Sequence, residues 1–223
     1  ALLRERLADE APVAPDLWHG AGGLVDAETL ASQVEELPEG LLPIVVAGGS
    51  FNSDGRRTRL REESRRLIDE LLETADPDKC FFVLGHRLGG CEGYLLRQNR
   101  GRFRVFAIVP GRLTRAERDR LQRGGAALRL SVEPNGSGLY KSFASEIFKR
   151  RPSVLLAFDG NSPGANLVQE AKNARVRCTI YVDPHSRALQ AKARMLKGYV
   201  RPLGEGEGTA RAIAERHGIL RGE

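Results

Sequence analysis

The chain has 223 residues, of which 41% are hydrophobic, and its formal net charge is +6 at pH 7. This length suits one sizeable α/β domain, alone or with a small appendage, with a core that needs no cross-link. No apolar run approaches the roughly 20 residues of a transmembrane helix. The first residues form no apolar signal segment and include no initiator Met, so we expect either processing or a piece of a longer protein.

Charge and cysteine content indicate the kind of binding partner and the cellular compartment. A net positive charge favours anionic partners, among them nucleotides, nucleic acids and acidic surfaces. Arginines alternate with acidic residues in residues 56–73 and 112–123, which is typical of solvated helices and makes nucleic acid a weaker candidate. The cysteines are odd in number, and two lie beside or inside apolar runs; they are Cys80, Cys91 and Cys178. We therefore expect reduced thiols in a cytoplasmic protein.

The first part of the chain predicts a helical appendage or linker, at residues 1–42. Within it, a short helix is expected at residues 2–8 and a second at about 26–37, with a Pro-rich stretch between them. We expect the main domain to span residues 43–203 and a C-terminal helix to occupy residues 204–223.

Two strands that each run into glycines open the main domain. Residues 43–49, PIVVAGG, predict a buried strand that leads into Gly48 and Gly49, and apolar positions of period 3.6 predict a helix across residues 60–72. Residues 80–85, CFFVLG, predict the second buried strand. Glycines at the end of a strand let backbone amides approach a ligand closely, so both strand ends are candidate binding loops.

The second of these loops contains four glycines within nine residues, and a helix is expected at about 94–98; the glycines are Gly85, Gly89, Gly90 and Gly93. A strand is predicted at residues 103–110. Thr114 and Glu117 have the spacing of a capping box and predict the start of a helix that ends near residue 123. Residues 127–132 predict a weaker edge strand, and a helix that contains Phe143 leads to the next strand.

The central unit of the chain is residues 153–182. Its apolar run at 154–158 predicts a strand buried on both faces, and the loop formers at 159–164 predict a turn in which Pro163 suits the first position of a helix. Residues 178–182 predict a second buried strand. A strand, helix and strand in this order pair their strands in parallel, so the loop lies at the carboxyl edge of the sheet, where the helix N-terminus favours an anion such as phosphate.

Smaller elements complete the chain. We expect a turn at 183–186, a helix at 187–196, a short strand at 198–202, a flexible break at 204–208 and a final helix at 209–217. Together the elements predict an α/β fold, a Rossmann-like three-layer sandwich with a mainly parallel sheet and helices on both faces.

Several kinds of site have no signal in the sequence. The four histidines are scattered, and no CxxC or HExxH spacing occurs, so we expect no metal site and no cofactor. There is no GxSxG elbow and no GxxxxGK[ST] loop, and Gly48, Gly49 and Ser50 do not complete a GxGxxG fingerprint. Aromatic residues are few and are not interleaved with basic ones, which argues against a stacking platform for single strands.

Three stretches carry a resemblance to a known family, over about residues 43–182. They are VVAGGS at 45–50, VLGHRLGGCE at 83–92 and AFDGNSPGANLV at 157–168. In order and spacing the chain resembles the SLOG superfamily, the Rossmann-like domains of the Smf/DprA and lonely-guy (LOG) proteins, and is most similar to the YspA/YpsA-related branch. Members bind nucleotides or nucleotide-derived ligands at the glycine edge, some hydrolyse the N-glycosidic bond of nucleoside monophosphates, others look like sensors, and many form dimers.

The resemblance implies binding roles for residues in all three glycine loops: Gly48, Gly49, Ser50, Gly85, Gly89, Gly90, Gly160, Asn161, Ser162, Gly164 and Asn166. Positive charge for a phosphate would come from Arg56, Arg57, Arg87 or Lys141. The chain departs from the family at Asp159, where members have Pro. Leu167 stands where the LOG pattern has its catalytic Glu.

Four functional hypotheses follow. The first is a nucleotide-binding module, sensory or regulatory, that forms homo-oligomers and is joined to other domains of a longer chain. The second is a nucleotide N-glycosidase, whose candidate carboxylates are Asp159 and Glu92, with Asp54 as the remaining acid in the glycine loops. The third is DNA binding of the DprA type, supported by net charge alone. The fourth is a scaffold that has kept the fold and lost the ligand.

Overall fold

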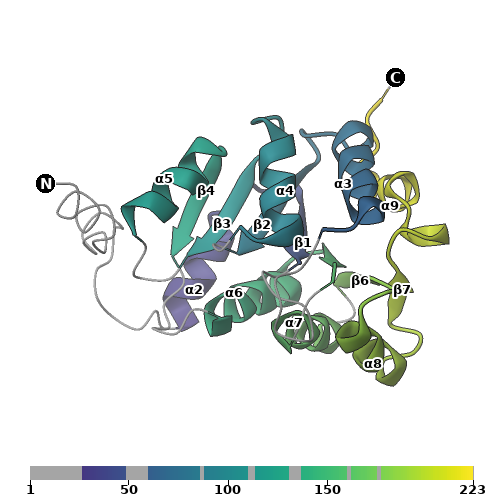
Figure 1. Ribbon diagram of the computed structural model, residues 1–223. Helices are drawn as coiled ribbons and strands as arrows, with labels where there is room; N and C mark the ends of the chain where they lie inside the picture. The colour runs from purple at the N-terminus through teal and green to yellow at the C-terminus, as the bar shows by residue number, and fades with distance from the viewer. Residues whose placement is uncertain are drawn as a thin grey trace, which may run out of the picture.

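Seven parallel strands form one sheet at the centre of the molecule (Figure 1). The computed structural model describes residues 27–48, 60–85, 88–109, 114–130, 137–159, 162–174 and 177–222. The strands are β1 (Leu42–Ala47), β2 (Cys80–Gly85), β3 (Val105–Val109), β4 (Ala126–Leu130), β5 (Ser153–Ala157), β6 (Cys178–Val182) and β7 (Val200–Pro202). Their order in the sheet is β4-β3-β2-β1-β5-β6-β7, and every neighbouring pair is parallel.

The strands form where the sequence has short, continuous apolar runs. Every residue of β2, β3 and β5 is buried, as expected for strands covered on both faces. In β1, Ile44 and Val46 belong to the core on one face of the sheet, and Val45 and Ala47 to the core on the other. The weaker strand β4 lies at one edge, as predicted.

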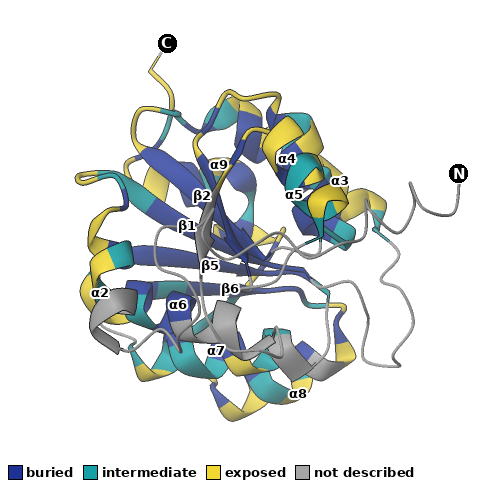
Figure 2. Ribbon diagram, turned by 90° about the vertical axis from the view of Figure 1, so that its left-hand side faces the viewer, coloured by how far each residue is buried: buried dark blue, intermediate teal, exposed yellow. Residues whose placement is uncertain are grey.

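Helices cover both faces and produce the predicted three-layer Rossmann-like sandwich (Figures 1 and 2). One face packs against α3 (Glu62–Thr74), α4 (Gly90–Asn99), α5 (Arg115–Arg123) and α9 (Ala210–Arg216). The other packs against α2 (Ala27–Glu35), α6 (Ser137–Arg150), α7 (Ser162–Asn173) and α8 (Arg187–Met195). The predicted capping box of α5 is confirmed, because the Thr114 hydroxyl accepts from the Glu117 amide and the Glu117 carboxylate from the Thr114 amide.

One predicted helix boundary is wrong. The helix expected at residues 94–98 begins four residues earlier, at Gly90, so part of the predicted glycine loop is the first turn of α4. At Gly93 a close backbone approach requires glycine, because a Cβ there would lie 2.1 Å from the carbonyl oxygen of Leu88. Gly93 therefore allows the loop before α4 to pack on the helix and does not mark a turn.

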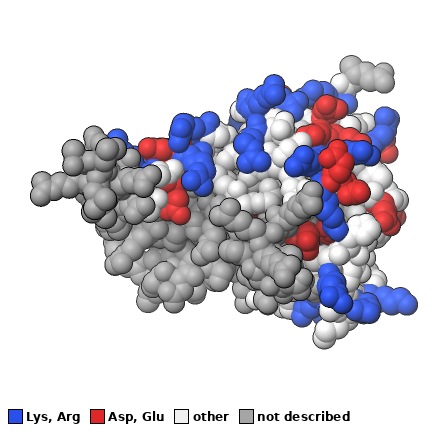
Figure 3. Space-filling model, viewed as in Figure 1, with Lys and Arg blue, Asp and Glu red and all other residues white. Residues whose placement is uncertain are grey.

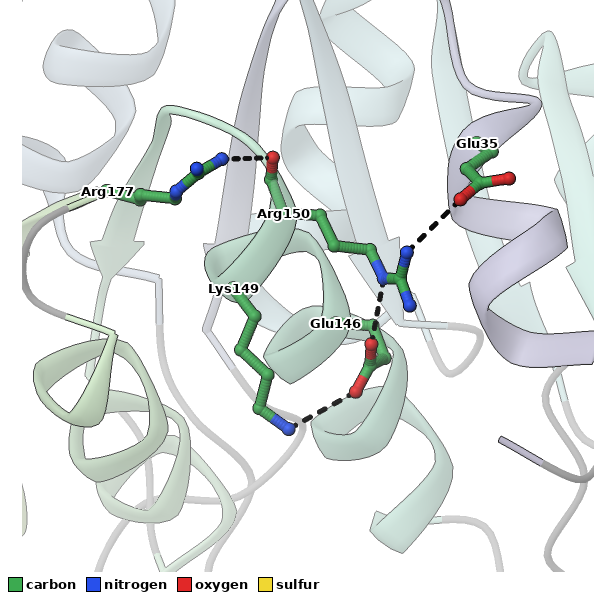
Figure 4. Close-up of polar contacts among 5 residues, drawn as sticks. All are labelled: Glu35, Glu146, Lys149, Arg150 and Arg177. Atoms are coloured by element: carbon green, nitrogen blue, oxygen red, sulfur yellow. Dashed lines mark hydrogen bonds and ion pairs between the residues drawn. The ribbon is translucent and has the colours of Figure 1, made fainter. Parts of the chain in front are cut away.

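An ion pair joins helix α2 to α6 (Figure 4). Arg150 pairs with Glu35 of α2 at 3.1 Å and with Glu146 of its own helix at 3.0 Å, and Lys149 contacts Glu146 at 3.2 Å. Arg177 donates to the backbone oxygen of Arg150 and ties α6 to the start of β6. These pairs are exposed, so the buried Val34 and Leu37 contribute more to holding this segment. The predicted helix at residues 2–8 lies outside the described residues.

The C-terminal segment packs against α3. Asp76 N donates to Ile219 O and Arg221 N to Thr74 O, both at 2.8 Å, while Ile213 is buried in the core beside α3. The GEGEG sequence, predicted as a flexible break, contains the 3-10 helix η2 (Gly206–Gly208). A Cβ at Gly208 would lie 1.8 Å from Pro202 O, so this glycine too permits a close approach.

Among the helices that the structure describes, none is both long enough and apolar enough to cross a bilayer. The division of the chain at residues 42 and 203 remains a prediction.

Candidate functional site

The order of the strands creates a switch point at the centre of the sheet. From β1 the chain builds outward through β2, β3 and β4, and from β5 it builds in the opposite direction through β6 and β7. The connections therefore leave β1 and β5 on opposite faces, although these strands are paired directly, Ile44 with Val154. In open parallel sheets a crevice forms at the carboxyl end of such a pair, and ligands bind there.

The described residues among the predicted binding residues all follow the carboxyl ends of strands. Gly48 comes directly after β1, and Gly85 is the last residue of β2. Gly89 is the N-cap of α4 and Gly90 its first residue, while Ser162, Gly164 and Asn166 lie in the first turns of α7. Gly49, Ser50, Asp54, Arg56, Arg57, Arg87, Gly160 and Asn161 lie outside the described residues, and the side chain of Lys141 does as well.

Two of these glycines are required by packing. A Cβ at Gly48 would lie 2.8 Å from the Cβ of Cys91 and 3.1 Å from that of Phe158. A Cβ at Gly85 would lie 3.2 Å from Oε2 of Glu92. The first turn of α4 thus sits directly against the ends of β1 and β2, and a larger residue at position 48 would push it away, whereas one at position 85 would displace the Glu92 carboxyl group.

Glu92, one of the two predicted catalytic carboxylates, lies inside this contact. Its side chain is buried in the first turn of α4. Burial raises the pKa of Glu92 to about 8, and backbone hydrogen bonds from Gly85 and Gly48 offset only part of this. Near neutral pH the side chain is therefore mostly protonated, a form that can donate a proton but cannot abstract one.

The loop before α4 has an unusual backbone. Leu88 has φ of 50° and Gly90 φ of 52°, both in the left-handed region. For a leucine this conformation is uncommon and costs on the order of 1 kcal/mol or more, and such residues concentrate at functional loops. The loop is held in this shape where Leu88 packs on the core and its carbonyl approaches Gly93.

The structure adds an ion pair that the sequence did not predict. Arg61, the N-cap of α3, donates through Nη2 to Oδ2 of Asp183, which directly follows β6. The Asp183 side chain is 5% exposed, and its Oδ1 accepts from the amide of His185 at 2.9 Å. Nε of Arg61 is buried without a hydrogen-bond partner among the described residues. An acid placed directly after a buried strand was the available signal, and it is the same signal that drew attention to Asp159.

The second predicted catalytic carboxylate lies on the neighbouring strand. Asp159 follows β5 and is partly exposed. The amides of Phe158 and Asp183 donate to Ala47 O at 2.6 Å and to Ala157 O at 2.8 Å, so the parallel pairing continues past the strand ends. The ends of β1, β5 and β6 are consequently held in register beside one another.

A small pocket opens beside the Arg61–Asp183 pair, with a volume of about 80 Å³. It is lined by Arg61, Glu63, Ser64, Leu67, Phe158, Asp183, Pro184, His185, Leu203, Gly204 and Glu205. A wider and shallower depression of about 460 Å³ continues from it along α8, sharing Pro184 and His185 and adding Arg187 and Arg194. The small pocket thus places carboxylates beside Arg61, and the depression along α8 adds arginines without a carboxylate, which suits a ligand that has both hydroxyl and anionic groups.

Below the pocket, the thiol of Cys91 is kept in its neutral form. Burial raises the pKa of Cys91, and the charges of Asp183 and Glu92 add to this effect, while Ser64 and Arg61 oppose it. All three cysteines of the chain are buried free thiols. No group of three or more His, Cys, Asp or Glu side chains in the described part of the chain could hold a metal ion.

Comparison with known proteins identifies the fold. No protein-family model matches the sequence, and no curated protein is similar to it. The structure is similar to two structures of the molybdenum cofactor carrier protein from Chlamydomonas reinhardtii, with TM-scores of 0.52 and 0.51. Each has 15% sequence identity and covers 79% of this chain, which in turn covers 98% and 97% of those chains. At this identity the likeness establishes a Rossmann-like fold, and membership of the SLOG superfamily stays a prediction.

Proposed function

We propose that the chain is a SLOG-type module that binds a nucleotide or nucleotide derivative at the carboxyl edge of its sheet, in a sensory or regulatory role. The observation that carries the proposal is the switch point between β1 and β5. Glycines follow β1 and end β2 at this edge, and α3, α4 and α7 begin there. Free amides and the positive ends of helices favour a phosphate group at such a place.

The two parts of a nucleotide would contact different parts of this edge. The phosphate would lie over the loops that follow β1 and β5, near the N-terminus of α7. The sugar hydroxyls would face the pocket, where carboxylates such as Asp183 can accept their hydrogen bonds. Arg61 lines this pocket and its side chain is 29% exposed, so its guanidinium is within reach of a ligand there.

The fold neighbours support a small-molecule ligand in general terms. They are named as carriers of the molybdenum cofactor, which is a small molecule rather than a macromolecular partner. A Rossmann-like fold hosts many functions, so the argument for a nucleotide rests on the glycine loops and the helix N-termini of this chain.

Hydrolysis of the N-glycosidic bond is the second candidate, and Asp159 is the residue that favours it. This carboxylate is partly exposed at the end of β5, beside the switch point, where it could position a water molecule. Glu92 is less suited to activate water because its raised pKa keeps it protonated at neutral pH. Binding without turnover therefore remains the leading proposal.

The test is a thermal-shift screen of the whole chain against nucleoside monophosphates, NAD-derived nucleotides and cyclic nucleotides. A ligand at a hundredfold excess over its dissociation constant adds about 2.7 kcal/mol to the stability of the folded state, enough to detect. Chromatography of the mixture then distinguishes binding, in which the nucleotide survives, from hydrolysis, in which the base is released. If hydrolysis occurs, Asp159→Ala should abolish it while nucleotide binding persists.

A matched pair of variants locates the ligand. Arg61→Gln should weaken binding of the nucleotide that emerges from the screen, whereas Arg66→Gln, an exposed arginine on the same helix, should not. Each variant is compared with its own unliganded stability, since Arg61→Gln also leaves Asp183 without its ion-pair partner. Equal binding by both variants would place the ligand away from this pocket, and no shift with any nucleotide would favour the scaffold hypothesis.

A further inference from the structure

A second depression lies between α4 and α5, and it is lined by arginines. Its volume is about 910 Å³, and its lining includes Arg97, Arg100, Arg120 and Arg123, all of them exposed, and no acidic residue. Figure 3 shows Lys and Arg side chains gathered over this part of the surface. We call this depression the arginine groove.

Glycines form the floor of the arginine groove. Gly101 and Gly125 end the turns that follow α4 and α5, with φ of 76° and 81°, and a Cβ at Gly125 would lie 3.8 Å from the Cα of Gly101. A Cβ at Gly124 would lie 2.6 Å from side-chain atoms of Leu96. These turns precede β3 and β4, so this end of the groove lies at the amino edge of the sheet, opposite the nucleotide site proposed above, while Leu88 and Gly93 extend its lining to the first turn of α4.

The acidic residues of α4 and α5 are paired elsewhere or largely uncharged. On α5, Asp119 pairs with Arg118 at 3.3 Å and lies 3.9 Å from Arg115, and Glu117 is held in the capping box with Thr114. On α4, burial raises the pKa of Glu92 to about 8, so it carries little negative charge at neutral pH. The four groove arginines form no ion pair with any carboxylate that the structure describes.

Arginines near helix C-termini also have an ordinary role, because they stabilise the negative end of the helix dipole. Arg123 illustrates it, since its Nε donates to Asp119 O at 3.1 Å. That bond uses one of the five donors of one guanidinium. It does not explain why two helices place their C-terminal arginines around a shared depression without acids.

We propose that the arginine groove binds an oligophosphate, several phosphate groups joined in one small molecule. Arginine forks hold phosphate oxygens in pairs of charge-assisted hydrogen bonds, and four arginines carry more positive charge than the roughly two negative charges of a single phosphate balance. The groove runs beside α4, whose ten residues extend about 15 Å, a length suited to a compact chain of phosphates.

Nucleic acid fits the groove less well. No aromatic side chain lines it, so bases would find no stacking surface. Tyr94, the aromatic residue of α4, instead bonds through its hydroxyl to Asp69 of α3 at 2.8 Å. Without an aromatic platform, the groove is better suited to phosphate groups than to bases.

The proposal is tested by calorimetric titration of the whole chain with inorganic tripolyphosphate at low salt. The double variant R97Q/R120Q should bind tripolyphosphate about tenfold more weakly or worse, since two arginines with charge-assisted bonds are removed. The control R66Q/R211Q removes the same charge from exposed sites on α3 and α9, and should bind within about twofold of the parent chain. Thermal unfolding verifies that each variant is folded, and R100Q/R123Q replaces the first variant if it is not.

Three results would overturn the proposal. The parent chain does not bind tripolyphosphate, or the control loses as much affinity as the groove variant. Binding is lost in Arg61→Gln and kept in the groove variant, which would assign the anion to the opposite edge of the sheet. A single-stranded oligonucleotide binds more tightly than tripolyphosphate and is lost in the same groove variant, which would make the groove a nucleic-acid site.

Discussion

A glutamate in the first turn of α4 shows how much a single position depends on its surroundings. In sequence, Glu92 stands in a glycine loop like an accessible catalytic acid. In the structure its carboxyl group lies against the ends of β1 and β2, so close that a Cβ at Gly85 would lie 3.2 Å from Oε2 and the carboxyl group would have to shift slightly. Its pKa of about 8 follows from that burial.

The pH dependence of stability provides the first prediction. The pKa of Glu92 rises from 4.5 in the unfolded chain to about 8 in the folded protein, so its contribution is fully present below 4.5 and is lost as pH rises through 8. Glu92→Gln removes this pH-dependent loss of stability, because glutamine does not ionise. We expect the variant to equal the parent chain near pH 4.5 and to exceed it by a few kcal/mol above pH 8, in urea unfolding at both pH values.

An exposed glutamate supplies the control for this experiment. Glu73→Gln, on the solvent side of α3, should change stability by about 0.5 kcal/mol or less at either pH. A Glu92→Gln variant whose difference from the parent is the same at both pH values would contradict the burial of an uncharged carboxyl group.

The Arg61–Asp183 ion pair also depends on the fold, because its two residues are distant in sequence. The two residues are 122 positions apart in sequence, and each is unremarkable there. Folding brings the start of α3 to the end of β6 and leaves Asp183 almost without solvent. Removing one partner from such a buried pair is more damaging than removing both, because it leaves an uncompensated charge.

At the scale of elements, α4 and the loop before it form one unit. The left-handed Leu88, the N-cap Gly89 and the close approach at Gly93 together allow the loop to fold onto the first turns of its own helix. The glycines that the sequence marked as a ligand loop are thus needed partly for packing. The two roles are compatible, because close packing of this loop also presents its backbone at the carboxyl edge.

Alanine substitutions at two helical glycines distinguish a steric role of glycine from its low helix propensity. Gly93→Ala places a Cβ 2.1 Å from Leu88 O, a backbone atom that can move only with its loop, so we expect it to destabilise the protein by about 2 kcal/mol or more. Gly164→Ala in α7 meets only Leu189 at 3.5 Å, an ordinary contact, and should be neutral or stabilising by up to about 1 kcal/mol. Chemical denaturation of both variants measures the difference, and similar values for the two would refute the structural reason given for Gly93.

At the scale of the whole molecule, the buried Glu92 and the half-buried His217, with shifted pKa values on opposite sides of neutrality, shape the dependence of stability on pH. His217, at the end of α9, lies 3.3 Å from the hydroxyl of the buried Tyr181. Burial lowers the pKa of His217 to about 4, and the positive charges of Arg216 and Arg201 act in the same direction. Its contribution is therefore present above pH 6.5 and is lost as pH falls through 4.

Glu92 and His217 have opposite effects on the unfolding free energy below pH 6.5, and Glu92 alone affects it above that pH. Between pH 6.5 and 4.5 the loss from His217 offsets part of the gain from Glu92, whereas from pH 6.5 to 8 Glu92 alone lowers stability. We expect the unfolding free energy to change little over the acid range and to fall over the alkaline one. In His217→Gln it should fall steadily from pH 4.5 upward, as measured by urea unfolding across the series. Parallel curves for the two proteins would show that His217 does not titrate as its burial requires.

The sequence by itself determined the order and type of the elements. All seven described strands were predicted within two residues at each end, and the central ones most clearly, because a strand buried on both faces must be apolar throughout. The spacing of Thr114 and Glu117 predicted a helix start correctly, since capping uses only neighbouring residues. Parallel pairing followed from the alternation of strands and helices.

Tertiary structure alone decided which side chains meet. The Arg61–Asp183 pair, the burial of Glu92 and the grouping of arginines from α4 and α5 all join positions that no local pattern relates. The glycines were ambiguous for the same reason, because a residue without a side chain can serve a turn, a ligand or a close contact equally well. Local preference fixes the elements, whereas the charge and protonation of a site depend on neighbours that only the folded chain supplies.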